Sequence, residues 1–241
     1  MAPAQRFTTE QQEELILNAA ITAIEETSLL GFKMSDIAKY AGMSMGSVYK
    51  HVQSKEDVLL ALATANLKQT QKHFAAIYQL ELTTPERYIA MILTDKSKAN
   101  LFPFASHLEM LITNDAILSR CSEAWKHRFH SADTNVDAQC SAYINQALAT
   151  KELRIPNGEQ DYANKFSLGL WAISVGFIHV SNQLRGKHLF GHITPDSELL
   201  DHTSLQIQTI KNYINAYDWQ SPLTDEGIHR AISALKTLDL R

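Results

Sequence analysis

One short segment carries side chains suited to recognising another molecule. They are small, hydroxylated or basic, and they are Met45, Ser47, Tyr49, Lys50 and His51. Val48 and Val52 lie four residues apart, so in a helix both would face the protein interior. A helix this short is not stable alone and must be held by its neighbours. A short, anchored helix that presents such side chains outward suits insertion into the major groove of DNA.

The elements that would position this helix are readable in Met34–Lys55. Apolar spacing predicts a helix over Ser35–Tyr40, and Gly42 would end it because glycine adopts the left-handed conformation with little strain. Ser44 can then accept hydrogen bonds from the free amides of a second helix, Met45–His51. Two short helices joined by such a turn form a helix-turn-helix.

The charge of the chain gives two opposite indications. The whole sequence has 22 basic and 26 acidic residues, a net charge of −4, which counts mildly against nucleic-acid binding. Around the motif the balance reverses, because residues 33–55 hold a single acid, Asp36, and four lysines: Lys33, Lys39, Lys50 and Lys55. A small positive face on an acidic body favours one docking orientation on DNA.

The segment DIAKYAGMSMGSVYKHVQSKEDVL resembles the TetR family of bacterial transcriptional regulators. The residues that match the family pattern are Asp36, Ile37, Ala38, Ala41, Gly42, Met43, Ser44, Gly46, Ser47, Tyr49, Ser54, Lys55, Glu56 and Leu59. Three positions depart from it: Val52 replaces a phenylalanine, Lys33 a capping threonine, and Ser28 a glycine that ends the preceding helix. The motif is long and ordered, and it covers about the first quarter of the chain.

The resemblance implies an all-α, two-domain, dimeric regulator. Residues 1–52 would be a three-helix helix-turn-helix DNA-binding domain, and residues 53–241 a larger helical bundle for effector binding and dimerisation. The default mechanism it implies is repression relieved by a small, mostly apolar ligand. The partners would be a second copy of the chain and an operator that is an inverted repeat of double-stranded DNA.

The predicted DNA contacts divide into two groups. Phosphate contacts are predicted for four side chains, Ser44, Tyr49, His51 and Lys55. Base-edge contacts are predicted for three, Met45, Ser47 and Lys50. Lys33 completes the set, because it stands where the family has a threonine that caps the helix and contacts phosphate.

The rest of the chain predicts more helices and no strand. With 45% hydrophobic residues, 9 glycines and 6 prolines, the composition is that of a globular, helix-rich protein. Two cysteines, no signal peptide and no membrane-length apolar run favour a cytoplasmic protein. The predicted helices span residues 8–27, 54–80, 87–94, 103–111, 115–150 with a break near 131–135, 160–185, 198–217 and 224–238, with a loop over 186–195.

Two late helices carry apolar stripes that predict either a core or a dimer interface. The first stripe contains Phe166, Gly169, Ile173, Gly176, Phe177 and Val180, and the second contains Leu200, Ile207, Ile210 and Ile214. A pair of glycines on one face indicates close approach of another helix, because glycine inside a helix costs about 1 kcal/mol relative to alanine. Periodicity fits a monomer core equally well. The resemblance favours the interface, since family members dimerise through their penultimate helices.

A cluster rich in aromatic residues is the candidate ligand site. Its members are Phe102, Phe104, His107, Met110, Leu111, Trp125, Phe129 and, on a later helix, Trp171. Helical bundles build ligand cavities between helices, and indole and imidazole N–H groups could orient a bound molecule. A solid core would give the same pattern.

The sequence holds no constellation for catalysis and no dense metal-ligand spacing. It lacks a glycine-rich phosphate loop, a nucleophile elbow and a paired Cys/His pattern, so neither an enzyme nor a cofactor is predicted. The alternatives to a ligand-controlled repressor are a regulator without a small-molecule ligand, an activator, and a helical interaction module that does not bind DNA.

Overall fold

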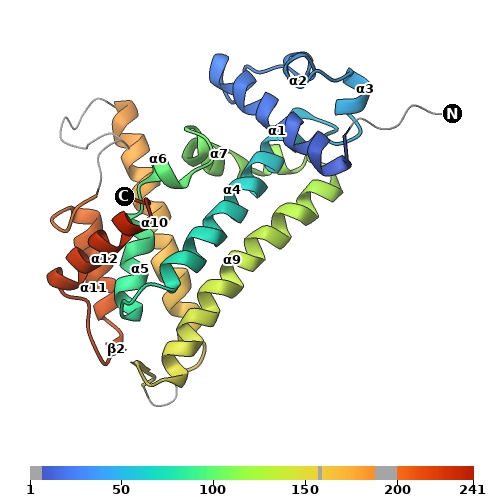
Figure 1. Ribbon diagram of the computed structural model, residues 1–241. Coiled ribbons are helices and arrows are strands. Elements are labelled where there is room, and N and C mark those ends of the chain that lie inside the picture. The colour runs from blue at the N-terminus through green and yellow to red at the C-terminus, as the bar shows by residue number, and fades with distance from the viewer. Residues whose placement is uncertain (1–6, 157–158, 188–199) are drawn as a thin grey trace. The chain divides into compact units, whose positions relative to one another are not determined.

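The computed structural model describes residues 7–156, 159–187 and 200–241, and these residues are almost entirely helical (Figure 1). The predicted all-α fold is confirmed. No helix among the described residues is long and apolar enough to cross a membrane.

The chain packs as two compact units. Unit 1 contains Met1–Lys68 and Leu101–Asp133, and unit 2 contains Gln69–Asn100 and Thr134–Arg241. Two long helices, α4 (Lys55–Tyr78) and α9 (Glu123–Ala149), begin in unit 1 and end in unit 2. The division predicted from the sequence, residues 1–52 and 53–241, concerns function and stays a prediction.

Unit 1 joins the amino-terminal helices to a later stretch of chain. It contains α1 (Thr9–Glu26), α2 (Met34–Tyr40), α3 (Met45–Val48), α7 (Ala105–Ile112), α8 (Asp115–Leu118) and the first parts of α4 and α9. One apolar core runs through all of them. Its buried members include Ile16, Ala20, Phe32, Ile37, Val48, Val52, Leu60, Leu62, Phe102, Leu108 and Trp125.

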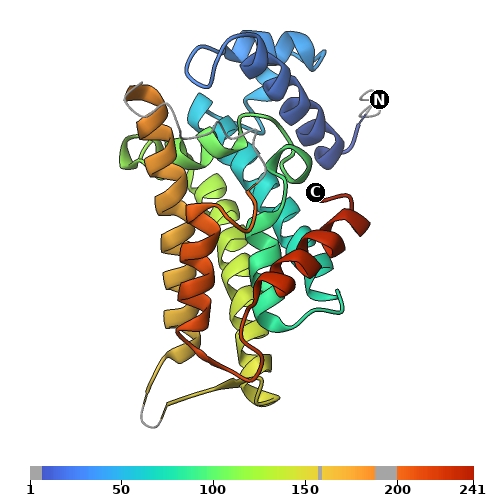
Figure 2. The same cartoon turned by 90° about the vertical axis from the view of Figure 1, so that its left-hand side faces the viewer.

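Unit 2 is a helical bundle with one minimal strand pair. Its helices include α5 (Thr84–Leu93), α6 (Lys96–Ala99), α10 (Tyr162–Lys187), α11 (Leu205–Asn215) and α12 (Asp225–Thr237). Strands β1 (Leu153–Arg154) and β2 (Asp218–Trp219) pair antiparallel, with Leu153 opposite Trp219. Helices α10 and α11 lie side by side in both views (Figure 2), and α5 packs against α11 and α12.

Helix starts follow the capping residues in the sequence. Thr8 forms a reciprocal capping box with Gln11, and Thr83 forms one with Glu86. Thr224 caps α12 by accepting from the backbone N–H of Gly227. These caps are local signals, which is why the predicted starts of α1 and α12 lie within one residue of the observed ones.

Several predicted boundaries are wrong. Helix α9 is continuous through residues 131–135, and the break in the predicted 115–150 helix lies at residues 119–122. Helix α11 begins at Leu205, α5 begins earlier than predicted, and α3 is shorter than predicted, with turns over residues 49–51. Helix α10 continues through Gly186 and Lys187. The remainder of the predicted loop, from residue 188 on, lies outside the described residues, as does the start of the predicted 198–217 helix.

Candidate nucleic-acid interface

The turn between α2 and α3 has the geometry that the sequence predicts. Gly42 has a φ of +63°, in the left-handed region that side chains rarely adopt. The next amide, Met43 N–H, donates to the Ala38 carbonyl at 3.0 Å and closes the end of α2. The chain therefore leaves α2 in one fixed direction toward α3.

Ser44 holds the start of α3. Its hydroxyl oxygen accepts from the Ser47 amide at 3.1 Å and lies 2.9 Å from the Ser47 hydroxyl. This bond satisfies one of the free amides at the helix start. The predicted cap is confirmed, and both hydroxyls are fixed near the amino end of α3.

The inner side of α3 is anchored by burial. Val48 and Val52 are completely or almost completely buried, beside Phe32 and Ile37 in the same core. The Lys55 ammonium lies 4.9 Å from the centre of the Phe32 ring and 3.5 Å from the Leu30 carbonyl oxygen. Packing of this kind compensates for the brevity of α3.

The outer side of α3 is open to solvent. Met45 is 37% exposed, Tyr49 is 45% exposed, and Lys50 is exposed, while Ser47 is partly covered. Lys33 is exposed at the start of α2 and makes no side-chain cap there. Most of the predicted DNA-contact residues thus lie at or near an accessible surface.

His51 is the exception among these residues. Its side chain is only 8% exposed, and its Nε2 lies 2.9 Å from the Gln12 amide oxygen of α1. Its Nδ1 lies 3.7 Å from a Glu13 carboxylate oxygen. A ring held in this way points into unit 1, so the structure contradicts its predicted phosphate contact.

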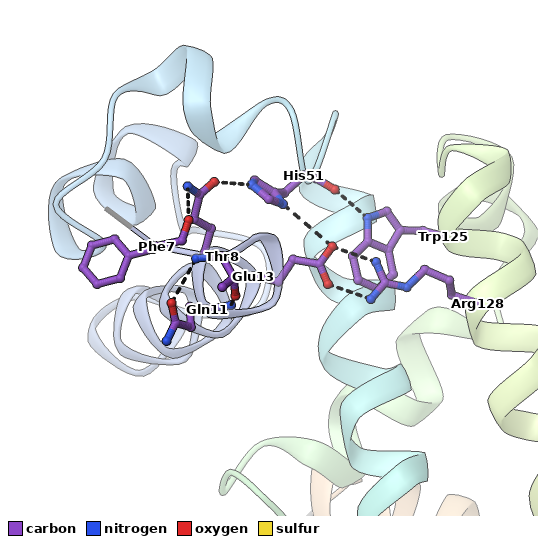
Figure 3. A network of polar contacts seen from close by, with 8 residues as sticks. Phe7, Thr8, Gln11, Glu13, His51, Trp125 and Arg128 are labelled. Atoms are coloured by element: carbon purple, nitrogen blue, oxygen red, sulfur yellow. Dashed lines mark hydrogen bonds and ion pairs between the residues drawn. The ribbon is translucent and has the colours of Figure 1, made fainter. Parts of the chain in front are cut away.

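Two residues of α9 complete the surroundings of His51 (Figure 3). The indole N–H of Trp125 donates to the His51 carbonyl oxygen at 2.8 Å. Arg128 stacks 3.8 Å above the Trp125 ring and donates to both Glu13 oxygens, at 3.0 and 2.7 Å. The hydrogen bond from Arg128 is the main reason that the pKa of Glu13 is lowered, although partial burial opposes it.

Sequence reasoning missed Gln12, Glu13 and Arg128. The His51–Gln12 contact joins residues 39 apart in sequence, and the Arg128–Glu13 contact joins residues 115 apart. No local pattern marks such pairs.

The candidate ligand residues differ in burial and belong to two units. Phe102 and Trp125 are buried in the core of unit 1, with Phe104, Leu111 and Phe129 packed against it and Met110 partly covered. His107 is exposed, and Trp171, in unit 2, is 63% exposed. The pocket-lining roles of His107 and Trp171 stay predictions. The packing of the others favours the solid-core alternative.

Four of the predicted interface residues are buried within the single chain. Phe166, Ile207, Ile210 and Ile214 are completely buried in the core of unit 2, and Leu200 packs against that core. A partner subunit could not reach these four side chains, so that part of the interface prediction is wrong. The α11 stripe is a core stripe.

The two glycines of α10 have different surroundings. A Cβ at Gly169 would overlap the Tyr213 hydroxyl and lie 2.5 Å from its Cζ, so this glycine allows close packing of α11 within the chain. A Cβ at Gly176 would meet nothing within 4 Å. Nearby, Ile173 and Phe177 are half-buried and Val180 is exposed.

The opposite side of α10 exposes an apolar surface that the sequence analysis did not single out. Leu168, Trp171 and Val175 follow at steps of three and four, so they share one helix face, and they are 63%, 63% and 43% exposed. We call these three residues the α10 outer face. Its signal in the sequence was a helix that is apolar on two sides.

Comparisons with known proteins agree with this fold. Residues 16–62 match the model of a family described as bacterial regulatory proteins, tetR family. A putative TetR-family regulator from Mesorhizobium loti is 15% identical over 88% of this chain and 99% of its own, with a TM-score of 0.56. A TetR transcription regulator from Haloarcula marismortui is 21% identical over 86% of this chain and 98% of its own, with a TM-score of 0.57.

A third solved structure is the fatty acid degradation regulator FadR from Bacillus halodurans. It is 13% identical over 83% of this chain and 94% of its own, with a TM-score of 0.53. At such identities, likeness to a solved structure speaks for the fold alone. No curated protein matches the sequence.

A capped, anchored and outward-facing α3 within this fold defines a helix-turn-helix DNA-binding protein. Residues 16–62 match the tetR family of bacterial regulatory proteins, so the amino-terminal part of the chain is a helix-turn-helix domain of that family. This match supports a DNA-binding transcriptional regulator, a class of proteins that are not enzymes.

Proposed function

We propose that this regulator is a dimeric repressor that binds an inverted-repeat operator and leaves it when a small, mostly apolar ligand binds. The observation that carries the DNA-binding part is the side-chain arrangement of α3. Tyr49 and Lys50 are exposed while Val48 and Val52 are buried. The buried valines fix α3 in place, and its outer side remains accessible to DNA. In this proposal residues 1–52 recognise DNA, and residues 53–241 form the dimer and bind the ligand.

The proposed contacts keep the two groups of side chains, with His51 withdrawn. Met45, Ser47 and Lys50 contact base edges, while Ser44, Tyr49, Lys33 and Lys55 contact phosphates. Lys55 is the first residue of α4, and its ammonium lies over the ring of Phe32. This position beside the exposed motif supports a phosphate contact for Lys55. Phosphate contacts give affinity without sequence preference, and base contacts give selectivity.

The dimer is proposed to form through the α10 outer face, whereas Val180 and Gly176 lie toward the other side of the helix, on the stripe that contains Phe166. Contiguous exposed apolar residues mark surfaces that bind a partner. A two-fold dimer presents two copies of α3 to successive major grooves, about 34–36 Å apart, which requires an inverted repeat. The remaining predicted members, Gly169, Ile173 and Phe177, lie at the edge of this surface or toward the core.

The proposed ligand class comes from a structural relative. One solved structure with this fold is described as a fatty acid degradation regulator, which favours straight-chain carboxylic acids as the first compounds to try. Ligand control acts by differential affinity for two states of the protein, typically 1–3 kcal/mol. A panel of such acids should weaken operator binding. If none does, a regulator without a small-molecule ligand remains.

The experiment that tests the DNA-binding proposal is selection from a random-sequence DNA library with the purified full chain. We expect enrichment of an inverted repeat. Lys50→Ala should then lose selectivity at one or two base pairs, at about 1–3 kcal/mol. Lys55→Ala should weaken binding to all sequences and flatten the salt dependence by about one unit. Equal losses on operator and random DNA for both variants would contradict these assignments.

A further inference from the structure

The last turn before α4 is tied to two other helices of unit 1. His51 follows Lys50 directly, and its amide donates to the Val48 carbonyl at 3.0 Å, so it belongs to the turn that extends α3. Its ring is bound to Gln12 of α1 and its carbonyl oxygen to Trp125 of α9. A shift of the His51 backbone therefore moves the two exposed side chains that precede it, Tyr49 and Lys50.

Helix α9 holds both of these partners. Trp125 and Arg128 are three residues apart and share one helix face. Arg128 binds both oxygens of Glu13, a geometry that fixes orientation as well as distance. The stacking of its guanidinium on the Trp125 ring joins the contact with α1 to the contact with the α3 turn (Figure 3).

The start of α9 has its own anchor to α4. The Asp57 carboxylate is completely buried and accepts from two backbone amides, Gln53 at 2.9 Å and Ser122 at 2.7 Å. Gln53 lies two residues after His51, and Ser122 directly precedes α9. Helix α9 is thus fixed next to the carboxyl end of the helix-turn-helix at two independent places.

We propose that Trp125 and Arg128 are positioning residues for operator recognition. Acting through His51 and Glu13, they set the orientation in which α3 meets base edges, without touching DNA. Direct base contacts depend on the geometry of each donor and acceptor, so loss of this support reduces selectivity more than it reduces general affinity for DNA. The inference rests on the operator binding proposed above.

The test uses three variants of the full chain: Arg128→Gln, Glu13→Gln and the double variant. The measured quantity is the ratio of affinities for the selected operator and for a shuffled duplex of the same length, at a temperature well below unfolding. We expect each single variant to lower this ratio about tenfold. The double variant should lower it no further, since both residues act through one contact.

The two single variants change the charge of the protein in opposite directions, which separates a positioning role from a direct phosphate contact. Arg128→Gln removes a positive charge and Glu13→Gln removes a negative one, yet positioning predicts losses in the same direction. If Arg128 contacts phosphate directly, its variant weakens binding to both duplexes, and Glu13→Gln strengthens it. That pattern would overturn the proposal.

Two further variants separate positioning from simple stability. Trp125→Phe removes the N–H donor to His51 and should lower the ratio about threefold to tenfold. Lys126→Gln is the matched control, because Lys126 pairs only with Glu123 of the same helix, at 2.8 Å, among the described ion pairs. Its ratio should stay within about twofold of the original, as expected for an exposed pair.

The possible failures are distinguishable. If the library yields no enriched sequence, operator binding itself fails and the inference fails with it. If an operator is found but the Arg128 and Glu13 variants keep the original ratio while unfolding at lower temperature, only the positioning role is overturned.

Discussion

Helices α10 and α11 carry apolar stripes of similar spacing, but they differ in what their other side presents. In α11 the stripe of Ile207, Ile210 and Ile214 is buried, and the opposite side carries polar residues such as Thr209 and Asn212. In α10 one side is buried through Phe166 and Leu170, and the opposite side is the exposed apolar outer face. Of these two helices, α10 therefore has the second apolar side, and α11 has a polar one.

This difference indicates how an apolar stripe that packs in the core can be distinguished from one that is available to a partner. When a helix has a single apolar stripe, that stripe is buried in the core of its own unit. A helix that is apolar on two sides retains one for a partner, because large exposed apolar patches are rare on monomers. The interface predicted from the sequence lay on the inner side of α10, whereas the proposed interface lies on its outer face.

The largest effect is expected from a charge in the α11 stripe. Ile210→Asp would bury a carboxylate in the core of unit 2 and should lower the free energy of unfolding by about 4 kcal/mol or more. Asn212→Asp, on the exposed side of the same helix, should change it by less than about 0.5 kcal/mol. Urea unfolding measures both. If the Ile210→Asp variant were stable but monomeric, the dimer interface would have to include α11.

The next effect concerns assembly. Trp171→Arg combined with Val175→Arg places two like charges on the α10 outer face, and it should weaken dimerisation by about 2–4 kcal/mol without loss of helical content. Sedimentation velocity over a range of concentrations measures it, with Ser233→Arg on the exposed side of α12 as the control. An unchanged dimer would place the interface elsewhere.

A smaller effect separates the two glycines of α10. Gly169→Ala forces a methyl group against Tyr213, whose hydroxyl donates to the Lys165 carbonyl at 2.9 Å, and should cost about 1–3 kcal/mol. Gly176→Ala meets open space and should stabilise the helix by up to about 1 kcal/mol. Both are best measured in the arginine double variant, so that assembly does not contribute. Equal effects would mean that α10 and α11 are not in close contact at Gly169.

The smallest effect lies on the polar side of α11. Lys211 donates to the Asp225 carboxylate at 2.7 Å and is the main reason that the pKa of Asp225 is lowered from 3.8. The pair therefore stabilises the folded chain above about pH 3.8, and this contribution is lost as pH falls through the lowered pKa. Lys211→Met should barely change thermal unfolding at pH 7, because Asp225 is exposed. An NMR titration should show its pKa returning toward 3.8, and an unchanged pKa would contradict the pairing.

The sequence predicted the helix-turn-helix because its signals are local. Gly42 and Ser44 define the turn within three residues, and capping residues such as Thr8 define helix starts. The two-residue strands β1 and β2 are too short to give an alternating pattern, so they were missed. The orientation of His51 depends on Gln12 and Trp125, which are distant in sequence, and no periodicity reveals such contacts.

The same limit explains the candidate ligand site and the interface. Spacing shows which residues share a helix face, but not which neighbour covers that face. Phe102 and Trp125 therefore looked like cavity residues and pack in a core, and Ile207 looked like an interface residue and is buried in its own unit.

We propose that two copies of this chain, joined through α10, place two copies of α3 on one inverted repeat. The most direct test is the mass of the complex between the full chain and a single duplex that carries the selected operator, measured by native mass spectrometry. We expect two copies of the chain per duplex, and one copy when Trp171 and Val175 of the α10 outer face are both changed to arginine. A single unmodified chain that binds the complete operator with full selectivity would contradict it.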